Sequence, residues 1–384
     1  MSPTAVKTLT DAIEQYWGNP SSLHTTGQTA KEALESARAE IAQLLGAESP
    51  REIYFTSGGS EADNQAILSA AQFGARKGKK HIISTKFEHH AVLHTLQKLQ
   101  KKGYEVELLD INENGVVTPE QVKNALRPDT ALVTVMYANN EIGTVQPIRE
   151  IGAICREAGV LFHTDAVQAV CHIPVSVRED NIDMLSLSAH KFHGPKGVGV
   201  LYAKKGIPLS TLIEGGAQER GKRAGTENMA AILSMVAAMR EELAQMDTVA
   251  AKLTAMRDRL IEGLEKIPHS KLNGDRERRV PATVNFCFEG IEGEALLLML
   301  DSEGIQASSG SACTSGSLDP SHVLLALGLP HEVAHGSLRL SIDASTTDEE
   351  ITHILTVVPE VVAYLRNMSP VWEALENGEK EHLI

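Results

Sequence analysis

SLSAHKFHGPKG, residues 186–197, is the segment that most narrowly defines the fold of this chain. It starts within an apolar run, 183–188, that is typical of a buried strand, and it ends in a loop rich in glycine and proline. Lys191 therefore stands just after the carboxyl end of a strand, where open α/β sheets bind their ligands. A lysine in that position can form a Schiff base with a carbonyl cofactor, although a lysine considered alone is usually a surface residue.

Strand and helix patterns alternate on both sides of this segment. Residues 29–45 and 61–76 have helical periodicity, Thr118 and Pro119 are typical of a helix start, and residues 147–158 predict a further helix. Between the helices we expect short apolar strands at 52–55, 81–85, 105–111, 131–138, 160–164, 183–188 and 198–203. Apolar strands separated by helices indicate an α/β fold with a large, mostly parallel sheet that is covered on both faces.

The pattern changes after about residue 226. Two long helical stretches, 226–246 and 248–266, follow each other without a strand. Strands then alternate with helices, near 282–288, 292–302, 320–327, 337–342 and 347–366. We predict a large domain over residues 10–245 and a smaller α+β C-terminal domain over 246–384, with residues 1–9 packing on the smaller one.

Composition excludes several classes of function. The chain has 384 residues, and 36 Lys and Arg against 50 Asp and Glu give a net charge of −14, which argues against nucleic acid as a partner. No apolar run is long enough to cross a membrane, and the first residues have no secretory h-region. Four cysteines do not make a disulfide framework in a chain of this length, and no CxxC spacing indicates a metal site. We expect a cytoplasmic enzyme.

A carboxylate precedes the lysine by one strand–crossover–strand unit. Asp165 follows the apolar run 160–164 and so lies at the same carboxyl edge as Lys191. A pyridoxal phosphate site needs this pair, because the lysine binds the aldehyde and the carboxylate keeps the pyridine nitrogen protonated. A helix N-cap is the alternative explanation for Asp165.

A glycine-rich turn supplies a candidate phosphate cradle. TSGGSEADN (56–64) follows one strand and opens a helix, so the backbone N–H groups of Gly59 and Ser60 lie at a positive helix end. The turn lacks the P-loop pattern, and by itself it is only a turn that could bind an anion. The Ser188 hydroxyl and the His190 imidazole could add further phosphate contacts.

Two more residues have the right chemistry for catalysis. His89 follows a strand at a helix start, where an imidazole could stack on a cofactor and move protons near neutral pH, although most of the 15 histidines are surface or cap residues. Cys313 lies among small polar residues in SSGSACTSGSLDPSH (308–322), which favours a mobile, reactive thiol. The other three cysteines have apolar neighbours typical of packing residues: Cys155, Cys171 and Cys287.

Eight motifs together resemble one family, the NifS/IscS-type cysteine desulfurases, which are fold-type I pyridoxal phosphate enzymes of the class V aminotransferase family. The resemblance covers nearly the whole chain and rests on GNPSSLH (18–24), TSGGSEADN (56–64), EHHAVL (88–93), NNEIGTVQPI (139–148), HTDAVQ (163–168), SLSAHKFHGPKG (186–197), RAGTEN (223–228) and SSGSACTSGS (308–317). The family normally begins with a strand resembling YLDNAATT, which has no counterpart here, so we expect either a trimmed start or an altered wall of the active site.

The resemblance implies a role for each matching residue. Lys191 would hold pyridoxal 5'-phosphate and move the substrate Cα proton, Asp165 would bind the ring nitrogen, and His89 would stack on the ring. Gln168 and Asn140 would contact the ring hydroxyl, and Arg339 with Asn140 would bind the substrate carboxylate. The phosphate would be held by Gly59, Ser60, Ser188, His190 and, from the second subunit of a homodimer, Thr226.

The implied activity is conversion of L-cysteine to L-alanine, with the sulfur held as a persulfide on Cys313. The sulfur would pass to an acceptor, such as an iron–sulfur scaffold protein. Three alternatives stay open from the sequence: a selenocysteine lyase, another class V enzyme, and a catalytically silent, desulfurase-like scaffold.

Overall fold

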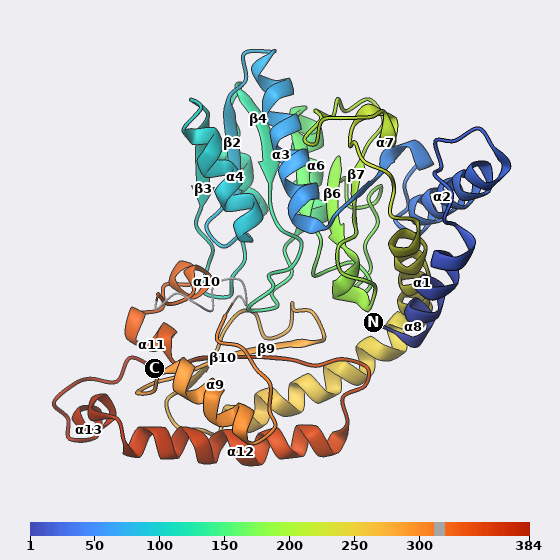
Figure 1. Ribbon diagram of the computed structural model, residues 1–384. Coiled ribbons are helices and arrows are strands. Elements are labelled where there is room, and N and C mark those ends of the chain that lie inside the picture. The colour runs from blue at the N-terminus through green and yellow to red at the C-terminus, as the bar shows by residue number, and fades with distance from the viewer. Residues whose placement is uncertain (311–318) are drawn as a thin grey trace. The chain divides into compact units, whose positions relative to one another are not determined.

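The computed structural model describes residues 1–310 and 319–384 of the chain (Figure 1). These residues form two compact units. Unit 1 comprises residues 1–109, 117–138 and 146–246, and unit 2 comprises residues 110–116, 139–145 and 247–384. The candidate site at the edge of the large sheet lies in unit 1, whereas Asn140, Arg339 and the flanks of the Cys313 segment belong to unit 2.

Unit 1 is built on a seven-stranded sheet with the order β1-β7-β6-β5-β4-β2-β3 among the described residues. Its strands are β1 (Ile53–Thr56), β2 (His81–Thr85), β3 (Glu105–Leu109), β4 (Thr130–Thr134), β5 (Leu161–Asp165), β6 (Met184–Ser188) and β7 (Gly199–Ala203). The strands from β3 to β6 are parallel, and only β7 runs against its neighbours. The predicted mostly parallel sheet is therefore confirmed.

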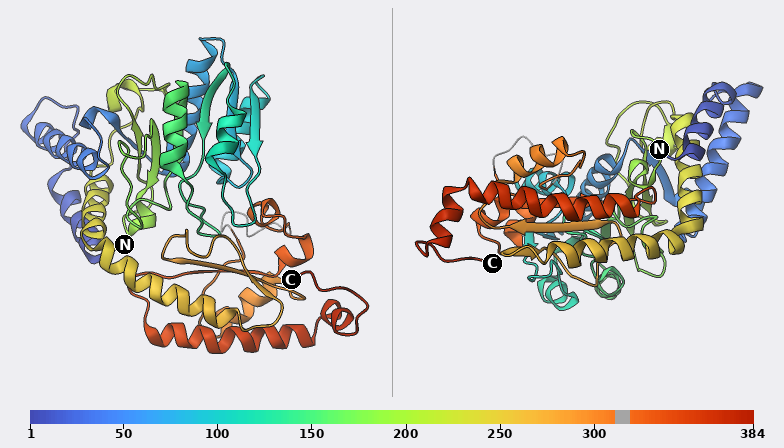
Figure 2. Two further views of the ribbon diagram at one scale, coloured as in Figure 1. Left: turned by 180° about the vertical axis from the view of Figure 1, so that it is seen from behind. Right: turned by 90° about the horizontal axis from the view of Figure 1, so that it is seen from below.

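Helices cover both faces of this sheet, and their limits follow from the sequence. The helices of unit 1 are α1 (Pro3–Gln15), α2 (Thr25–Leu44), α3 (Gly59–Ala75), α4 (His90–Gln100), α5 (Pro119–Ala125), α6 (Ile148–Ala158) and the short α7 (Gln218–Gly221). Helices α3 and α4 lie on one face and α6 on the other (Figures 1 and 2). Thr118 caps α5 with a reciprocal capping box, and Pro119 is its first residue, as expected.

Unit 2 has a three-stranded antiparallel sheet of order β10-β9-β8, made of β8 (Ser270–Leu272), β9 (Thr283–Phe288) and β10 (Ser337–Ser341). Its helices are α9 (Gly293–Ser302), α10 (His322–Ala326), α11 (His331–His335), α12 (Asp348–Asn367) and α13 (Pro370–Glu376). Gly263 lies on the long helix α8 (Met229–Leu264), and a Cβ on it would lie 2.3 Å from Leu355 Cδ2, so this glycine lets α12 approach α8 closely. Phe286, Leu338 and Val358 are buried in the core between sheet and helices.

Three features differ from the sequence expectations. The two helices expected at 226–246 and 248–266 are one helix, α8 (Met229–Leu264), which is continuous across the division between the units. The segments 110–116 and 139–145 join unit 2, although both lie inside the range expected for the large domain. Residues 1–9, which we expected on the smaller domain, contact unit 1, where Ser2 N donates to His193 O and Ser234 Oγ donates to Ala5 O.

Within the described residues, every helix is too short or too polar to cross a bilayer.

Candidate active site

The candidate site of unit 1 lies where parallel strands β4, β5 and β6 end side by side. Asp165 is the last residue of β5, and Ser188 is the last residue of β6. Lys191 follows in a 3₁₀ turn, Ala189–Phe192, and His89 stands just before α4. The carboxyl edge of a parallel sheet is the usual place for a ligand in this architecture. The chain thus brings Asp165, Ser188, Lys191 and His89 to one edge, as the sequence predicted.

Asp165 is held rigidly at this edge. Its Oδ1 accepts a hydrogen bond from Val167 N at 3.0 Å, and the residue is only 5% exposed. Burial raises the pKa of Asp165, and the nearby Lys191 and His89 act in the opposite direction. Asp165 is a strand-end carboxylate with an Asx-type turn, not the cap of a regular helix, so the N-cap alternative is wrong.

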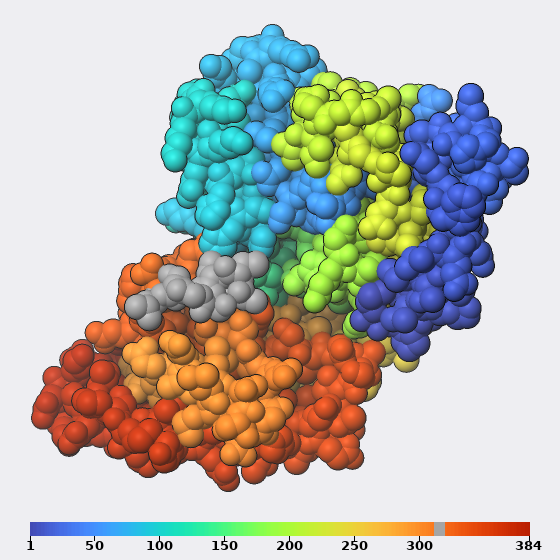
Figure 3. All heavy atoms as spheres, in the orientation of Figure 1, coloured from blue at the N-terminus to red at the C-terminus, as the bar shows by residue number. Residues whose placement is uncertain are grey.

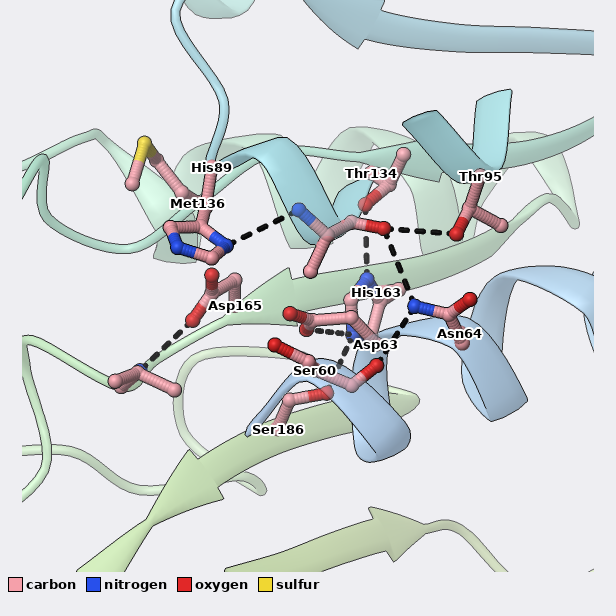
Figure 4. Close-up of polar contacts among 12 residues, drawn as sticks. Ser60, Asp63, Asn64, His89, Thr95, Thr134, Met136, His163, Asp165 and Ser186 are labelled. Atoms are coloured by element: carbon pink, nitrogen blue, oxygen red, sulfur yellow. Dashed lines mark hydrogen bonds and ion pairs between the residues drawn. The ribbon is translucent and has the colours of Figure 1, made fainter. Parts of the chain in front are cut away.

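His89 faces Asp165 with a defined tautomer (Figure 4). It is the N-cap of α4, and its Nδ1 accepts a hydrogen bond from Ala91 N at 3.1 Å. The proton of the neutral imidazole is therefore on Nε2. A ring nitrogen of His89 and carboxylate oxygens of Asp165 and Asp63 all lie within 4.8 Å of one another. The imidazole is thus fixed in place and has one nitrogen to donate or exchange a proton.

The turn that contains Lys191 is fixed by its neighbours. His172 Nε2 donates to Lys191 O at 2.9 Å, and Gly194 N donates to Ala189 O at 2.9 Å. Ser188 Oγ and His190 Nδ1 are hydrogen-bonded at 2.9 Å. The Lys191 side chain itself is exposed.

Beside Ser188, Gly58 and Gly59 of the glycine-rich turn present main-chain atoms that carry no side chain. Gly59 is the first residue of α3, so the N–H groups of Gly59 and Ser60 have no acceptor within the helix. Gly58 has a φ of +150°, and a Cβ on Gly199 would lie 2.7 Å from Gly58 Cα. A Cβ on Gly59 would lie 2.7 Å from Val167 Cγ2 and 3.7 Å from Ser188 Cβ. The cradle predicted from the sequence thus adjoins the Asp165 turn.

The RAGTEN loop reaches the same helix start. Arg223 Nε donates to Glu61 Oε1 at 2.9 Å, and Glu61 Oε2 in turn accepts from Ser57 N at 2.8 Å. Thr226 is exposed and lines a small cavity with Ser57 and Gly197. Glu61 is an acidic residue in the first turn of α3, and its ion pair with Arg223 offsets its negative charge. This helix end therefore remains favourable for an anion.

Three buried groups behind Asp165 were missed by the sequence analysis. Asp63 on α3 is 1% exposed and Glu88 is fully buried, while His163 lies on β5 two residues before Asp165. His163 could have been found from the sequence, because residues two apart on a strand share a face of the sheet and His163 lies two residues before Asp165. Asp63 and Glu88 gave no such signal.

Burial controls the protonation of these groups. It raises the pKa of Glu88 to about 8, although Thr85 Oγ1 and Met136 N donate to its carboxyl oxygens. Burial and the charge of Asp165 together raise the pKa of Asp63 well above its usual range. Burial also lowers the pKa of His163 to about 3. Two unit charges 4.8 Å apart repel by about 3 kcal/mol at an effective dielectric constant of about 20, so the carboxyl groups do not all ionise together.

Unit 2 brings the two candidate substrate residues together. Arg339 on β10 donates from Nη1 to Asn140 O at 3.2 Å. The neighbouring Asn139 Oδ1 accepts from Glu141 N and Ile142 N, which holds the backbone around Asn140 in a turn. Ser308 N donates to Arg339 O, so the chain that leads toward Cys313 passes beside the arginine. Cys313 itself lies outside the described residues.

The other cysteines are protected. Cys155, Cys171 and Cys287 are free thiols in the interior. Burial raises the pKa of Cys155 and of Cys287 to about 12 and raises that of Cys171 as well. These three thiols are thus protonated and out of reach of a substrate.

Comparison with known proteins agrees with this geometry. The model of the class-V aminotransferase family matches residues 1–354. Cysteine desulfurase IscS of Clostridium botulinum is 52% identical over 99% of this chain and 96% of its own length, and that of Methanosarcina thermophila is 52% identical over 95% and 90%. A solved NifS-like protein has a TM-score of 0.89 at 35% identity, covering 95% of this chain and 97% of its own. SspA, solved in complex with cysteine, has a TM-score of 0.79 at 35% identity, covering 90% and 97%.

The chain belongs to the class-V aminotransferase family and, within it, to the cysteine desulfurases. It is a pyridoxal phosphate-dependent enzyme, so the predicted family, fold class and cofactor are confirmed. The residues fit this cofactor, because Gly58 and Gly59 leave backbone N–H groups accessible for a phosphate and Asp165 offers a buried carboxylate for a pyridine nitrogen.

Proposed function

We propose that this enzyme removes sulfur from L-cysteine, releases L-alanine and holds the sulfur as a persulfide on Cys313. The observation that supports this most is the fixed pair of Asp165 and His89 beside the Lys191 turn. Relatives that match the chain over nearly its full length and are named cysteine desulfurase support the same activity.

In this proposal, unit 1 holds the cofactor. Pyridoxal phosphate, when bound, withdraws electrons from the substrate Cα and so acidifies the Cα–H bond. Lys191 Nζ holds the cofactor and moves the Cα proton, and the Asp165 carboxylate keeps a proton on the ring nitrogen. His89 would stack on the ring and would keep its proton on Nε2, while Gln168, which is half-buried three residues after Asp165, would contact the ring hydroxyl.

The phosphate contacts come from the edge of α3. The N–H groups of Gly59 and Ser60, at the positive end of the helix dipole, bind the anion together with the hydroxyls of Ser60 and Ser188. His190, which is hydrogen-bonded to Ser188, orients that hydroxyl and adds a second donor.

In unit 2, Arg339 binds the substrate carboxylate and Asn140 assists it. Arg339 Nη1 donates to Asn140 O, and a planar guanidinium is suited to a bidentate pair with a carboxylate. We also assign to the Asn140 side chain a contact with the ring hydroxyl.

The nucleophile is the Cys313 thiolate. Its Sγ attacks the substrate sulfur, the Sγ–S bond forms as the substrate Cβ–S bond breaks, and the three-carbon fragment takes up protons to become alanine. The burial of Cys155, Cys171 and Cys287 supports this choice, because none of them offers an accessible thiolate.

We further propose a homodimer in which Thr226 is donated to the phosphate of the partner subunit. Thr226 is exposed in the single chain, which is expected of a residue that a partner subunit would cover. Apolar side chains are also exposed on and after α1, in the blue region of Figure 3, which favours a second copy as the cover. They are Val6 (48% exposed), Ile13 (60%), Trp17 (73%) and Leu23 (95%).

We place the enzyme in the cytoplasm, where reducing conditions preserve free thiols. There the persulfide sulfur passes to an acceptor, and an iron–sulfur scaffold protein is the acceptor that we favour.

Product analysis tests the proposed activity. The purified chain is incubated with pyridoxal phosphate, L-cysteine and a thiol reductant, and alanine, sulfide and keto acids are measured. We expect equal amounts of alanine and sulfide, none from Lys191→Ala, and no keto acid. Keto acid as the product would indicate an aminotransferase, activity restricted to L-selenocysteine would indicate a selenocysteine lyase, and no product at all would contradict catalysis.

A further inference from the structure

A polar layer lies between α3 and the sheet, directly behind Asp165 (Figure 4). Thr134 stands opposite His163 in the β4–β5 pair, and Ser186 stands opposite Asp165 in the β5–β6 pair. Because paired residues share a face of the sheet, all four side chains leave the face that α3 covers. Asp63 projects from α3 into this layer.

The imidazole in this layer supplies no positive charge. Thr134 Oγ1 lies 2.8 Å from His163 Nδ1, and Ser186 Oγ lies 3.0 Å from His163 Nε2. His163 has no exposed surface, and burial keeps it neutral at physiological pH. The ring is thus a neutral spacer, held at both nitrogens by hydroxyl groups.

Asp63 has a poor environment for a negative charge. Its Oδ1 lies 3.6 Å from His163 Nε2, is shielded from solvent and has no hydrogen-bond partner among residues 1–310 and 319–384. A hydrogen bond from the Ser186 side chain favours its ionised form, while the carboxyl groups of Asp165 and Glu88 both oppose ionisation. A buried carboxylate without a cation or a full set of donors is costly, whereas the neutral acid is not.

Asp165 differs from Asp63 in each of these respects. It accepts a hydrogen bond from a main-chain N–H, and the nearby Lys191 and His89 favour its ionised form. When two carboxyl groups lie this close, the one with donors and cations ionises, and the other retains its proton.

We propose that Asp63 is a positioning residue that acts through Asp165: it remains a neutral acid behind the site, so that Asp165 is the single carboxylate presented to the cofactor ring. This role rests on the proposed function of Asp165. The neutral Asp63 fills the space between α3, His163 and Ser186. The negative charge then lies on Asp165, at the edge of the sheet, and not inside the polar layer.

Infrared spectroscopy of the cofactor-free protein tests the protonation state without any turnover. We expect the difference spectrum of wild type and Asp63→Asn, at neutral pH, to show the loss of a protonated carboxyl band. The matched control is Asp180→Asn, since Asp180 is also buried but is paired with Arg149 at 3.2 Å, and it should lose only carboxylate bands. Loss of a carboxylate band in Asp63→Asn would overturn the inference.

Cofactor binding tests the positioning role. Asp63→Asn mimics the neutral acid, so its affinity for pyridoxal phosphate and the pH dependence of the bound cofactor's visible absorbance should match wild type. Asp63→Ala leaves Ser186 and His163 without their partner, and we expect about tenfold weaker binding and a shifted absorbance titration. Equal loss in both variants, or an Asp63→Asn chain that does not fold, would contradict a neutral Asp63. The infrared result stands even if L-cysteine proves not to be the substrate.

Discussion

His163 and Asp165 leave the same face of β5, two residues apart, and the imidazole of His163 is held between Thr134 and Ser186. The strand end that presents Asp165 is therefore braced from behind by a neutral, fully hydrogen-bonded ring. This arrangement explains how a carboxylate can be kept buried and oriented at the edge of the sheet.

Glu88 should make the stability of the protein depend on pH. Its folded pKa of about 8 lies above the ordinary value of 4.5, so the folded state binds the extra proton and stability falls as pH rises from about 4.5 to 8. Glu88→Gln removes this loss, and we expect the variant to gain up to about 4 kcal/mol over wild type between pH 5 and pH 9. Thermal unfolding of the cofactor-free proteins at both pH values measures the difference. Parallel pH profiles for the two proteins would refute the buried, proton-binding Glu88.

A methyl group on Gly59 should disturb the site through Val167. The added Cβ would lie 2.7 Å from Val167 Cγ2, and Val167 N is the donor that orients Asp165. We expect Gly59→Ala to cost about 1–3 kcal/mol of stability and to weaken cofactor binding. The double variant Gly59→Ala with Val167→Ala restores the space, so its affinity for pyridoxal phosphate should recover. Fluorescence titration with the cofactor provides the measurement, and failure of the second substitution to help would exclude the steric explanation.

Arg339 should determine the KM for L-cysteine. A bidentate, charge-assisted contact is worth about 1.5–3 kcal/mol, so Arg339→Ala should raise KM by about 10- to 100-fold. Arg339→Lys retains the charge without the planar fork and should fall between wild type and Arg339→Ala. Arg257→Lys, a change at a buried arginine of unit 2, serves as the control and should leave KM unchanged. Steady-state kinetics that show a fall in kcat alone would argue against a carboxylate contact.

The four cysteines should separate by reactivity. We expect one rapidly modified thiol in the native protein, Cys313, and three that react only after unfolding, because burial keeps Cys155, Cys171 and Cys287 protonated. A timed reaction with a chromogenic thiol reagent, followed by peptide mapping, identifies them. Rapid modification of Cys313→Ala would show that another thiol is accessible.

Much of the large sheet could be predicted because its strands are continuous apolar runs separated by marked helix starts. The first and last residues of β2, for instance, match the predicted strand, and the helix start at Thr118 and Pro119 was visible as a residue pattern. The carboxyl-edge placement of Asp165 and Lys191 followed from the same pattern. These features depend on local spacing, which the sequence contains directly.

The remaining features depend on tertiary packing. We expected two helices that meet near Asp247, but the low helix propensity of residues such as Asp247 costs less than about 1 kcal/mol each, and burial of Leu253 and Met256 in the core of unit 2 outweighs it. Asp63 on α3 and Asp165 on β5 come close only when the helix packs on the sheet, so no local spacing in the sequence indicates this contact. Assignment of residues 110–116 and 139–145 to unit 2 also arises only once the chain is folded.

The persulfide on Cys313 is the most direct test of the proposed mechanism. The holoenzyme is mixed with one equivalent of L-cysteine in the absence of reductant, its peptides are analysed by mass spectrometry, and alanine is measured in the same sample. We predict one added sulfur atom on the peptide that contains Cys313, one equivalent of alanine, and neither product in Cys313→Ala. Alanine formation with no sulfur on Cys313, or with sulfur on one of the other three cysteines, would contradict the account.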